Sequence, residues 1–123
     1  MNIFSRLFSI GRRNNNIQTL EEFQKLNSDQ RTVLIMKWGD SGKSDYFQFL
    51  KFAILKDLDI GVKFAALKRI HLFKNIPETI PMLNKLKAED WGKNYEPYFS
   101  MALSKLGIIT LEEFADIVNM KKD

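Results

Sequence analysis

The chain of 123 residues is predicted to fold as one all-α domain. Apolar residues recur at the spacing of an α-helix along most of the sequence, and short polar or proline-containing links separate these stretches. The string TLEEF, which suits a helix start, occurs twice. No convincing alternation of period two appears outside the run Val33–Met36, where a strand is the alternative. These observations predict about six to seven helices within a single domain over residues 1–123.

Residues 1–16 are predicted to hold a short N-terminal helix and a polar link. The apolar residues of the helix, within residues 2–10, share one face: Ile3, Phe4, Leu7 and Phe8. Such a helix packs against the next one or lies on a membrane surface. Residues 11–16, which are mostly arginine and asparagine, form the link.

The two TLEEF strings predict where the next helix and the last helix begin. The Thr19 side chain can accept a hydrogen bond at the helix start while the carboxylate of Glu22 reaches back to the Thr19 amide. Thr110 and Glu113 repeat this capping box. The last helix is therefore expected to run from Thr110 to about Met120.

Two further helices are predicted between these ends. The first runs from Ser28 to Trp38. The second runs from Asp45 to Asp57, with Ser44 as its cap. Because the second helix is apolar nearly all round, we expect it to be buried on several sides at the centre of the domain.

Asp59 is predicted to cap a helix that ends at Phe73. Its apolar stripe consists of Val62, Ala66, Ile70 and Phe73. Its basic residues are expected to face solvent, namely Lys63, Lys68, Arg69 and Lys74.

Prolines predict where two more helices begin. Pro77 and Pro81 mark the start of one, and Pro97 lies in the first turn of another, because proline suits positions whose N–H would be unpaired anyway. That second helix is expected to end at Gly107, since glycine adopts the left-handed conformation at a helix end. The intervening residues 91–94 are predicted to form a loop.

The segment Asp57–Ile70 reads DLDIGVKFAALKRI. It resembles the turn and second helix of a HEAT repeat, whose loose pattern is Asp-x-Asp-x-x-Val-Arg-x-x-Ala. Its apolar residues recur 36 positions later, as the pairs Ala66 and Ala102, Leu67 and Leu103, and Ile70 and Leu106. The resemblance covers residues 44–107 and implies a short stack of antiparallel helix pairs. A helical bundle with chance similarity is the alternative.

The composition excludes several classes of site. The chain has no cysteine, which rules out disulfides, thiolate zinc sites and cysteine nucleophiles. No apolar stretch approaches the roughly 20 residues that span a bilayer, so we expect a cytoplasmic protein without a transmembrane segment. The net charge of +4 is concentrated in the half that ends at Lys74. This basic half could attract nucleic acid or anionic lipid, with solvated helix faces as the plainer interpretation.

No pattern in the sequence predicts catalysis, a cofactor or a metal site. The string GDSGKS at Gly39–Ser44 resembles a phosphate-binding loop, but that motif needs a glycine where this chain has Lys37. His71 is the only histidine and lies beside apolar residues. Carboxylate pairs at helix starts are explained by the helix dipole. We therefore expect a protein that is not an enzyme.

Aromatic residues beside charged ones predict a partner-binding surface, because tryptophan and tyrosine dominate many protein interfaces. Trp91 folding back on the core is the alternative. Stacked helix pairs usually hold partners, so the resemblance implies a protein-binding module. A looser analogy of size and architecture suggests a bacterial immunity protein, which covers the active site of a cognate toxin domain. The predicted partner-binding residues are Trp91, Lys93, Tyr95, Glu96, Tyr98, Lys63, Arg69, Glu89, Asp90, Trp38 and Tyr46.

Nucleic-acid binding is the alternative function. Some HEAT-like proteins resemble DNA glycosylases that hold duplex DNA on a basic concave face. The basic residues expected to contact phosphates here are Lys56, Lys63, Lys68, Arg69 and Lys74. Such binding would weaken steeply with salt, because each neutralised phosphate releases counterions.

Overall fold

The computed structural model describes residues 18–122. The helix predicted within residues 2–10 lies outside this range. The described residues form seven α-helices and three short 3-10 helices, and none of them lies in a strand. The prediction of an all-α fold is therefore confirmed, and Val33–Met36 is helical.

The helices follow one another with short links. The α-helices are α2 (Leu20–Gln24), α3 (Ser28–Ser41), α4 (Phe47–Leu55), α5 (Ile60–Leu67), α6 (Thr79–Ala88), α7 (Tyr98–Lys105) and α8 (Leu111–Lys122). The 3-10 helices are η2 (Ser44–Tyr46), η3 (Ile70–Phe73) and η4 (Trp91–Tyr95).

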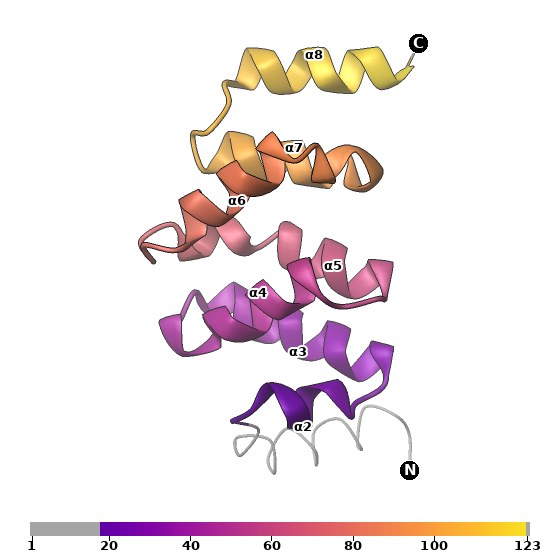
Figure 1. Ribbon diagram of the computed structural model, residues 1–123, viewed down its shortest axis with the longest axis vertical. Helices are drawn as coiled ribbons and strands as arrows, with labels where there is room; N and C mark the ends of the chain where they lie inside the picture. The colour runs from indigo at the N-terminus through magenta and orange to yellow at the C-terminus, as the bar shows by residue number, and fades with distance from the viewer. Residues whose placement is uncertain (1–17, 123) are drawn as a thin grey trace.

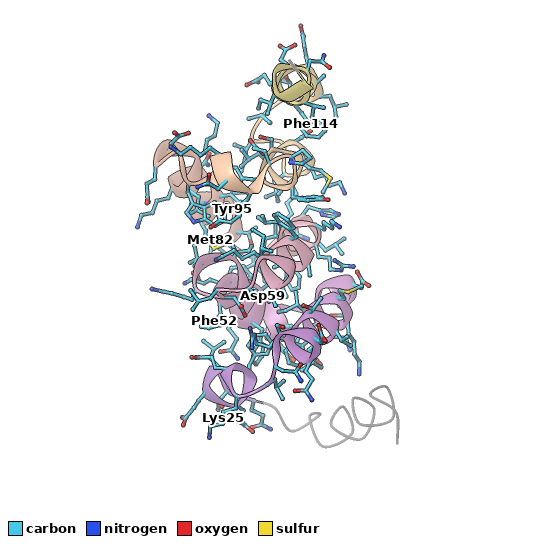
Figure 2. The ribbon with its side chains drawn as sticks, turned by 90° about the vertical axis from the view of Figure 1, so that its right-hand side faces the viewer. Lys25, Phe52, Asp59, Met82, Tyr95 and Phe114 are labelled. Atoms are coloured by element: carbon cyan, nitrogen blue, oxygen red, sulfur yellow. The ribbon has the colours of Figure 1, made fainter. Side chains whose placement is uncertain are left out.

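The helices stack along the long axis of the molecule, from α2 at one end to α8 at the other (Figure 1). From the side they form two layers (Figure 2). We call α2, α4 and α6 the even layer, and α3, α5 and α7 the odd layer. In the odd layer α3 packs against α5 and α5 against α7, and α4 joins the layers by packing on both α3 and α5. This stack of helix pairs is compatible with a helical-repeat fold.

Capping residues fix three of the predicted helix starts, although the Glu22 carboxylate accepts from the Gln18 amide and the Thr19 hydroxyl. The Thr19 hydroxyl accepts from the Glu22 amide at 3.1 Å, and the Asp59 carboxylate accepts from the Val62 amide at 3.1 Å. At Thr110 the capping box is complete, because the Glu113 carboxylate also accepts from the Thr110 amide at 3.2 Å. These bonds satisfy amides that have no partner within the helix.

The helix predicted to end at Phe73 stops instead at Leu67. The amide of Arg69 bonds to Ala66 O at 3.0 Å, one residue short of α-helical pairing. The guanidinium of Arg69 donates to Ala65 O at 2.9 Å and so takes the carbonyl that a continuing helix would use. The chain then turns into η3.

Two other predicted boundaries are wrong. The helix expected from Asp45 begins at Phe47, and Ser44 makes no capping hydrogen bond because it lies inside the 3-10 turn η2. The loop predicted at residues 91–94 is part of η4.

The core runs through the middle of the stack. Residues that correspond at the spacing of 36 positions are all buried: Ala66, Leu67, Ile70, Ala102, Leu103 and Leu106. The stripe predicted for residues 59–73 is likewise buried, with Val62 and Ala66 of α5 and Ile70 of η3 at 0% exposure. The repeated spacing therefore marks equivalent core positions in two successive levels of the stack.

Candidate functional site

The exposed side of α4 is hollowed. Phe52 and Leu55 are half-buried there, although the sequence predicts this helix to be covered on several sides. One hollow, of about 440 Å³, is lined by Leu20, Gln48, Lys51, Phe52, Leu55 and Lys56. The expectation that α4 is buried on several sides agrees with its packing on α2, α3 and α5, but α2 and α6 leave an apolar strip of it uncovered.

Neighbouring hollows join this one into a continuous surface. One, of about 260 Å³, shares Leu55 and Lys56 with it and reaches Met82 and Trp91. Another, of about 220 Å³, shares Phe52 and Lys56 with it and ends at Leu58. We call this surface the α4 groove. Its floor is formed by Leu20, Phe52, Leu55, Met82 and Trp91, and its rim carries Lys51, Lys56 and Lys85.

The α4 groove lies on the even layer. Phe52 and Met82 project from the same side of the stack at successive levels (Figure 2). Leu58 is 98% exposed at one end of the groove, in the turn between α4 and α5. An apolar side chain held in water next to an apolar hollow is a feature that partner binding would explain.

Trp91 closes the other end of the groove and is held by its neighbours in η4 and α7. Its ring lies 4.4 Å from that of Tyr95 and 5.4 Å, edge-on, from that of Phe99. Phe99 can approach because residue 92 is glycine, where a Cβ would lie 1.9 Å from the Phe99 ring. Trp91 is thus partly packed on the core and partly available at the surface.

Lys63 lies beneath this aromatic pair. The sequence predicts that its side chain faces solvent, and the structure shows that it does not. It is 9% exposed, and its Nζ donates to Ile54 O at 3.0 Å. The ammonium is 5.9 Å from the centre of the Trp91 ring and 5.7 Å from that of Tyr95. Burial lowers the pKa of Lys63, and the nearby Asp57 carboxylate partly offsets that decrease. Lys63 therefore supports the groove from inside and is not a surface contact.

The charges around the groove are only partly paired. Asp57 is paired with Arg31, and Lys51 on the rim is paired with Glu78. Lys56 and Lys85 are exposed and have no ion-pair partner among the described residues. Two cations therefore remain available beside the apolar floor.

The remaining predicted site residues lie elsewhere. Trp38 is 4% exposed and stacks on Tyr46 at 5.1 Å, so its ring belongs to the core. Arg69 donates to Asp40 at 2.9 Å on the odd layer. Tyr98 is also on that layer, with Lys68 4.7 Å above its ring. These residues do not line the α4 groove, and neither does Tyr95, which contacts the ring of Trp91.

The acidic residues near Trp91 are divided between two surfaces. Glu89 lines the α4 groove, whereas Asp90, Lys93 and Glu96 line a separate hollow of about 200 Å³ between η4, α7 and α8. Glu96 accepts hydrogen bonds from the amide and hydroxyl of Ser100 and so serves the start of α7. The structure therefore does not present these acidic residues as one edge.

The basic residues considered for phosphate contact do not share a face. Lys56 lies at the α4 groove, Lys63 is buried, and Arg69 is paired with Asp40. Lys68 stacks over Tyr98 in the odd layer. Lys56 and the buried Lys63 therefore do not share an exposed face with Lys68 and Arg69, and Lys74 is exposed beyond η3.

Sequence reasoning missed Phe52, Leu55 and Met82 as surface residues. One available signal was the composition of α4, which carries more apolar residues than a helix with one solvent face normally does. A second signal was Leu58, an apolar residue between the two turn aspartates.

Comparison of the chain with protein-family models, curated proteins and solved structures found no match. Within residues 18–122 no group of three histidine, aspartate or glutamate side chains is placed to hold a metal ion. No helix in that range has the length and apolar character needed to cross a bilayer.

Proposed function

We propose that this protein is a non-enzymatic protein-binding module and that the α4 groove is its binding surface. The observation that carries the proposal is the continuous apolar floor over α2, α4, α6 and η4, with Phe52, Leu55, Met82 and Trp91 all half-buried. Exposed apolar surface of this extent, rimmed by charged residues, is typical of interaction sites. Phe52 and Trp91 offer the aromatic anchors on which binding energy usually concentrates.

The groove suits a macromolecule better than a small molecule. It is formed by a chain of shallow hollows that share lining residues, and it spans the space from Leu58 to Trp91. Small-molecule sites bury most of the ligand within one concavity, whereas an open surface spread over several helices suits a partner that lies across it.

We further propose that the partner is a toxin domain and that this chain is an immunity protein of the HEAT-like helical type. The support is the small helical stack, the repeat resemblance at Asp57–Ile70 and the exposed aromatic surface. Binding would act by occlusion, with the even layer lying over the toxin's active site. Glu89 beside Trp91 would suit a basic rim around that site.

Site-specific photo-crosslinking in the source organism tests the binding surface. A benzophenone amino acid replaces Met82 in the groove or, as a matched control, Met36 on the odd layer. Both methionines lie on a helix surface, and Met36 is 41% exposed. We expect one defined adduct from position 82 that is absent from position 36. Adducts of equal pattern from both positions, or none from position 82, would contradict the proposed surface.

The toxin proposal is tested on the protein recovered in that adduct. Its expression alone should arrest growth, and co-expression of this chain should restore it. The variants Trp91→Ala and Tyr95→Ala should weaken the rescue while retaining the helical circular dichroism spectrum. A recovered partner without toxicity would leave the binding module in place and remove the immunity function.

A further inference from the structure

We propose that the α4 groove receives an amphipathic helix of the partner whose apolar face is flanked by acidic residues. This inference rests on the proposed function and specifies the chemistry of the bound segment. It follows from the secondary structure around the groove, from its apolar floor and from the unpaired cations on its rim.

The secondary structure favours a helix as the occupant. A partner strand needs an exposed sheet edge, and no residue from 18 to 122 lies in a sheet. The groove instead follows α4 between two flanking helices of the same layer. Such a position suits a further helix, whose side chains at positions i, i+3, i+4 and i+7 would meet the floor.

The apolar floor of the groove determines which side chains the bound helix should present. Leu20, Phe52 and Leu55 line the hollow of about 440 Å³, and Met82 and Trp91 continue the apolar surface toward α6. Leu58 extends the apolar surface past the end of α4. Methionine adapts to differently shaped apolar groups, and Trp91 offers a flat aromatic contact. A row of leucine or phenylalanine side chains fits these contacts.

The charged residues on the rim of the groove determine which charge the flanks of the bound helix should carry. Lys56 lies at the end of α4 and Lys85 lies on α6, so each of these two helices contributes one unpaired lysine to the lining of the hollow that holds Met82. Asp57 in the groove is already paired by Arg31. Glu89 contributes one negative charge against these two positive ones. Carboxylates on both flanks of a bound helix would therefore meet unneutralised cations.

Two synthetic peptides test this inference directly. Both are amphipathic helices of 18 residues with the same leucine and phenylalanine face. One carries glutamate on its flanks and the other lysine. Binding of the fluorescein-labelled peptides to the intact chain is measured by anisotropy at two salt concentrations. We expect the glutamate peptide to bind at least tenfold more tightly at low salt, and the difference to shrink as salt rises.

Matched variants separate a rim effect from the general positive charge of the protein. The double variant Lys56→Ser/Lys85→Ser should weaken the glutamate peptide about tenfold. The double variant Lys37→Ser/Lys105→Ser removes the same charge from exposed positions on the odd layer and should leave the affinity unchanged. Equal losses from both double variants would overturn the inference, because they would show attraction by net charge alone.

Failure of this inference and failure of the proposed function give different results. Equal binding of both peptides, or binding of neither, removes the acidic helix. A defined crosslink from position 82 would still place a protein partner in the groove. Absence of that crosslink removes the groove as the binding surface, whatever the peptides do.

Discussion

The guanidinium of Arg31 in α3 holds both carboxylate oxygens of Asp57 in the turn that follows α4. Arg31 Nε lies 2.8 Å from Asp57 Oδ2, and Nη2 lies 3.1 Å from Oδ1. The same arginine donates to Leu26 O, and Asp57 also accepts from the Asp59 amide at 2.9 Å. Asp57 is 3% exposed, so this ion pair lies inside the stack. It joins the turn before α3, which contains Leu26, to the turn that follows α4.

Replacement of Asp57 by alanine should destabilise the fold by about 3 kcal/mol, because it leaves the guanidinium of Arg31 without its counter-charge. The measurement is urea denaturation followed by circular dichroism. Asp45→Ala, at an exposed position, is the control and should stay within about 0.5 kcal/mol of the parent chain. The double variant Arg31→Met/Asp57→Leu should recover much of the loss. A double variant less stable than Asp57→Ala would show that the pair itself stabilises the fold.

Lys63 should make the stability of the protein increase with alkaline pH. Burial holds the pKa of Lys63 below its ordinary value of 10.5. Between that lowered pKa and 10.5 the unfolded chain binds more protons than the folded one, so the free energy of unfolding rises with pH. We expect the parent chain to gain stability relative to Lys63→Met as the pH is raised toward 10.

The comparison uses urea denaturation at several pH values. Lys25→Met removes a positive charge from a side chain that is 75% exposed, and it serves as the control for charge loss alone. An identical pH trend in Lys63→Met and the parent chain would contradict the role assigned to burial.

His71 should weaken the fold in mild acid. Burial, and then the positive charge of Lys105, lower the pKa of His71 below 6.5. Its Nδ1 is buried and lacks a hydrogen-bond partner in the described structure. Because the unfolded chain takes up the proton first as the pH falls, stability decreases through the window below pH 6.5.

Thermal denaturation of the parent chain and His71→Gln between pH 7.5 and 5 measures this effect. The parent chain should lose more of its melting temperature than the variant over that interval. Because His71 is the only histidine, its ring resonances in an NMR titration report the same pKa directly. Parallel curves for the two proteins would rule out this contribution.

Gly92→Ala should cost about 1–3 kcal/mol, because the added Cβ would collide with the ring of Phe99. Gly107→Ala provides a contrast, since nothing lies within 4 Å of its Cβ and only the φ of +78° is unfavourable. That variant should cost about 1 kcal/mol. Only Gly92→Ala should also shift the fluorescence of Trp91, which packs on Phe99. An unchanged spectrum would mean that the ring moves aside freely.

Local signals in the sequence are sufficient to predict which segments are helical and where several of the helices begin. Thr19, Asp59 and Thr110 cap helices as predicted because each acts over three or four residues, which sequence spacing describes well. The break after Leu67 escaped prediction because it depends on where the long side chain of Arg69 reaches. The burial of Lys63 is not predicted for a related reason, since it depends on helices that are distant in sequence.

The candidate site was harder to foresee than the fold. The sequence singles out Trp91 and Tyr95 because aromatic residues beside charged ones stand out, and of the two only Trp91 lines the α4 groove; their role in binding stays a prediction. Phe52 and Leu55 have the pattern of core residues, and only the spacing of α4 from its neighbours makes them accessible. Arg31 gave no sign of its pairing with Asp57, because the two are 26 positions apart.

The helices of the odd layer pack against one another more closely than the helices of the even layer do. Close packing continues from α3 through α5 to α7, whereas α4 and α6 border a shared hollow that the Lys51–Glu78 ion pair bridges. The closely packed odd layer therefore resists deformation. A partner that inserts side chains between α4 and α6 would therefore displace little of the existing packing.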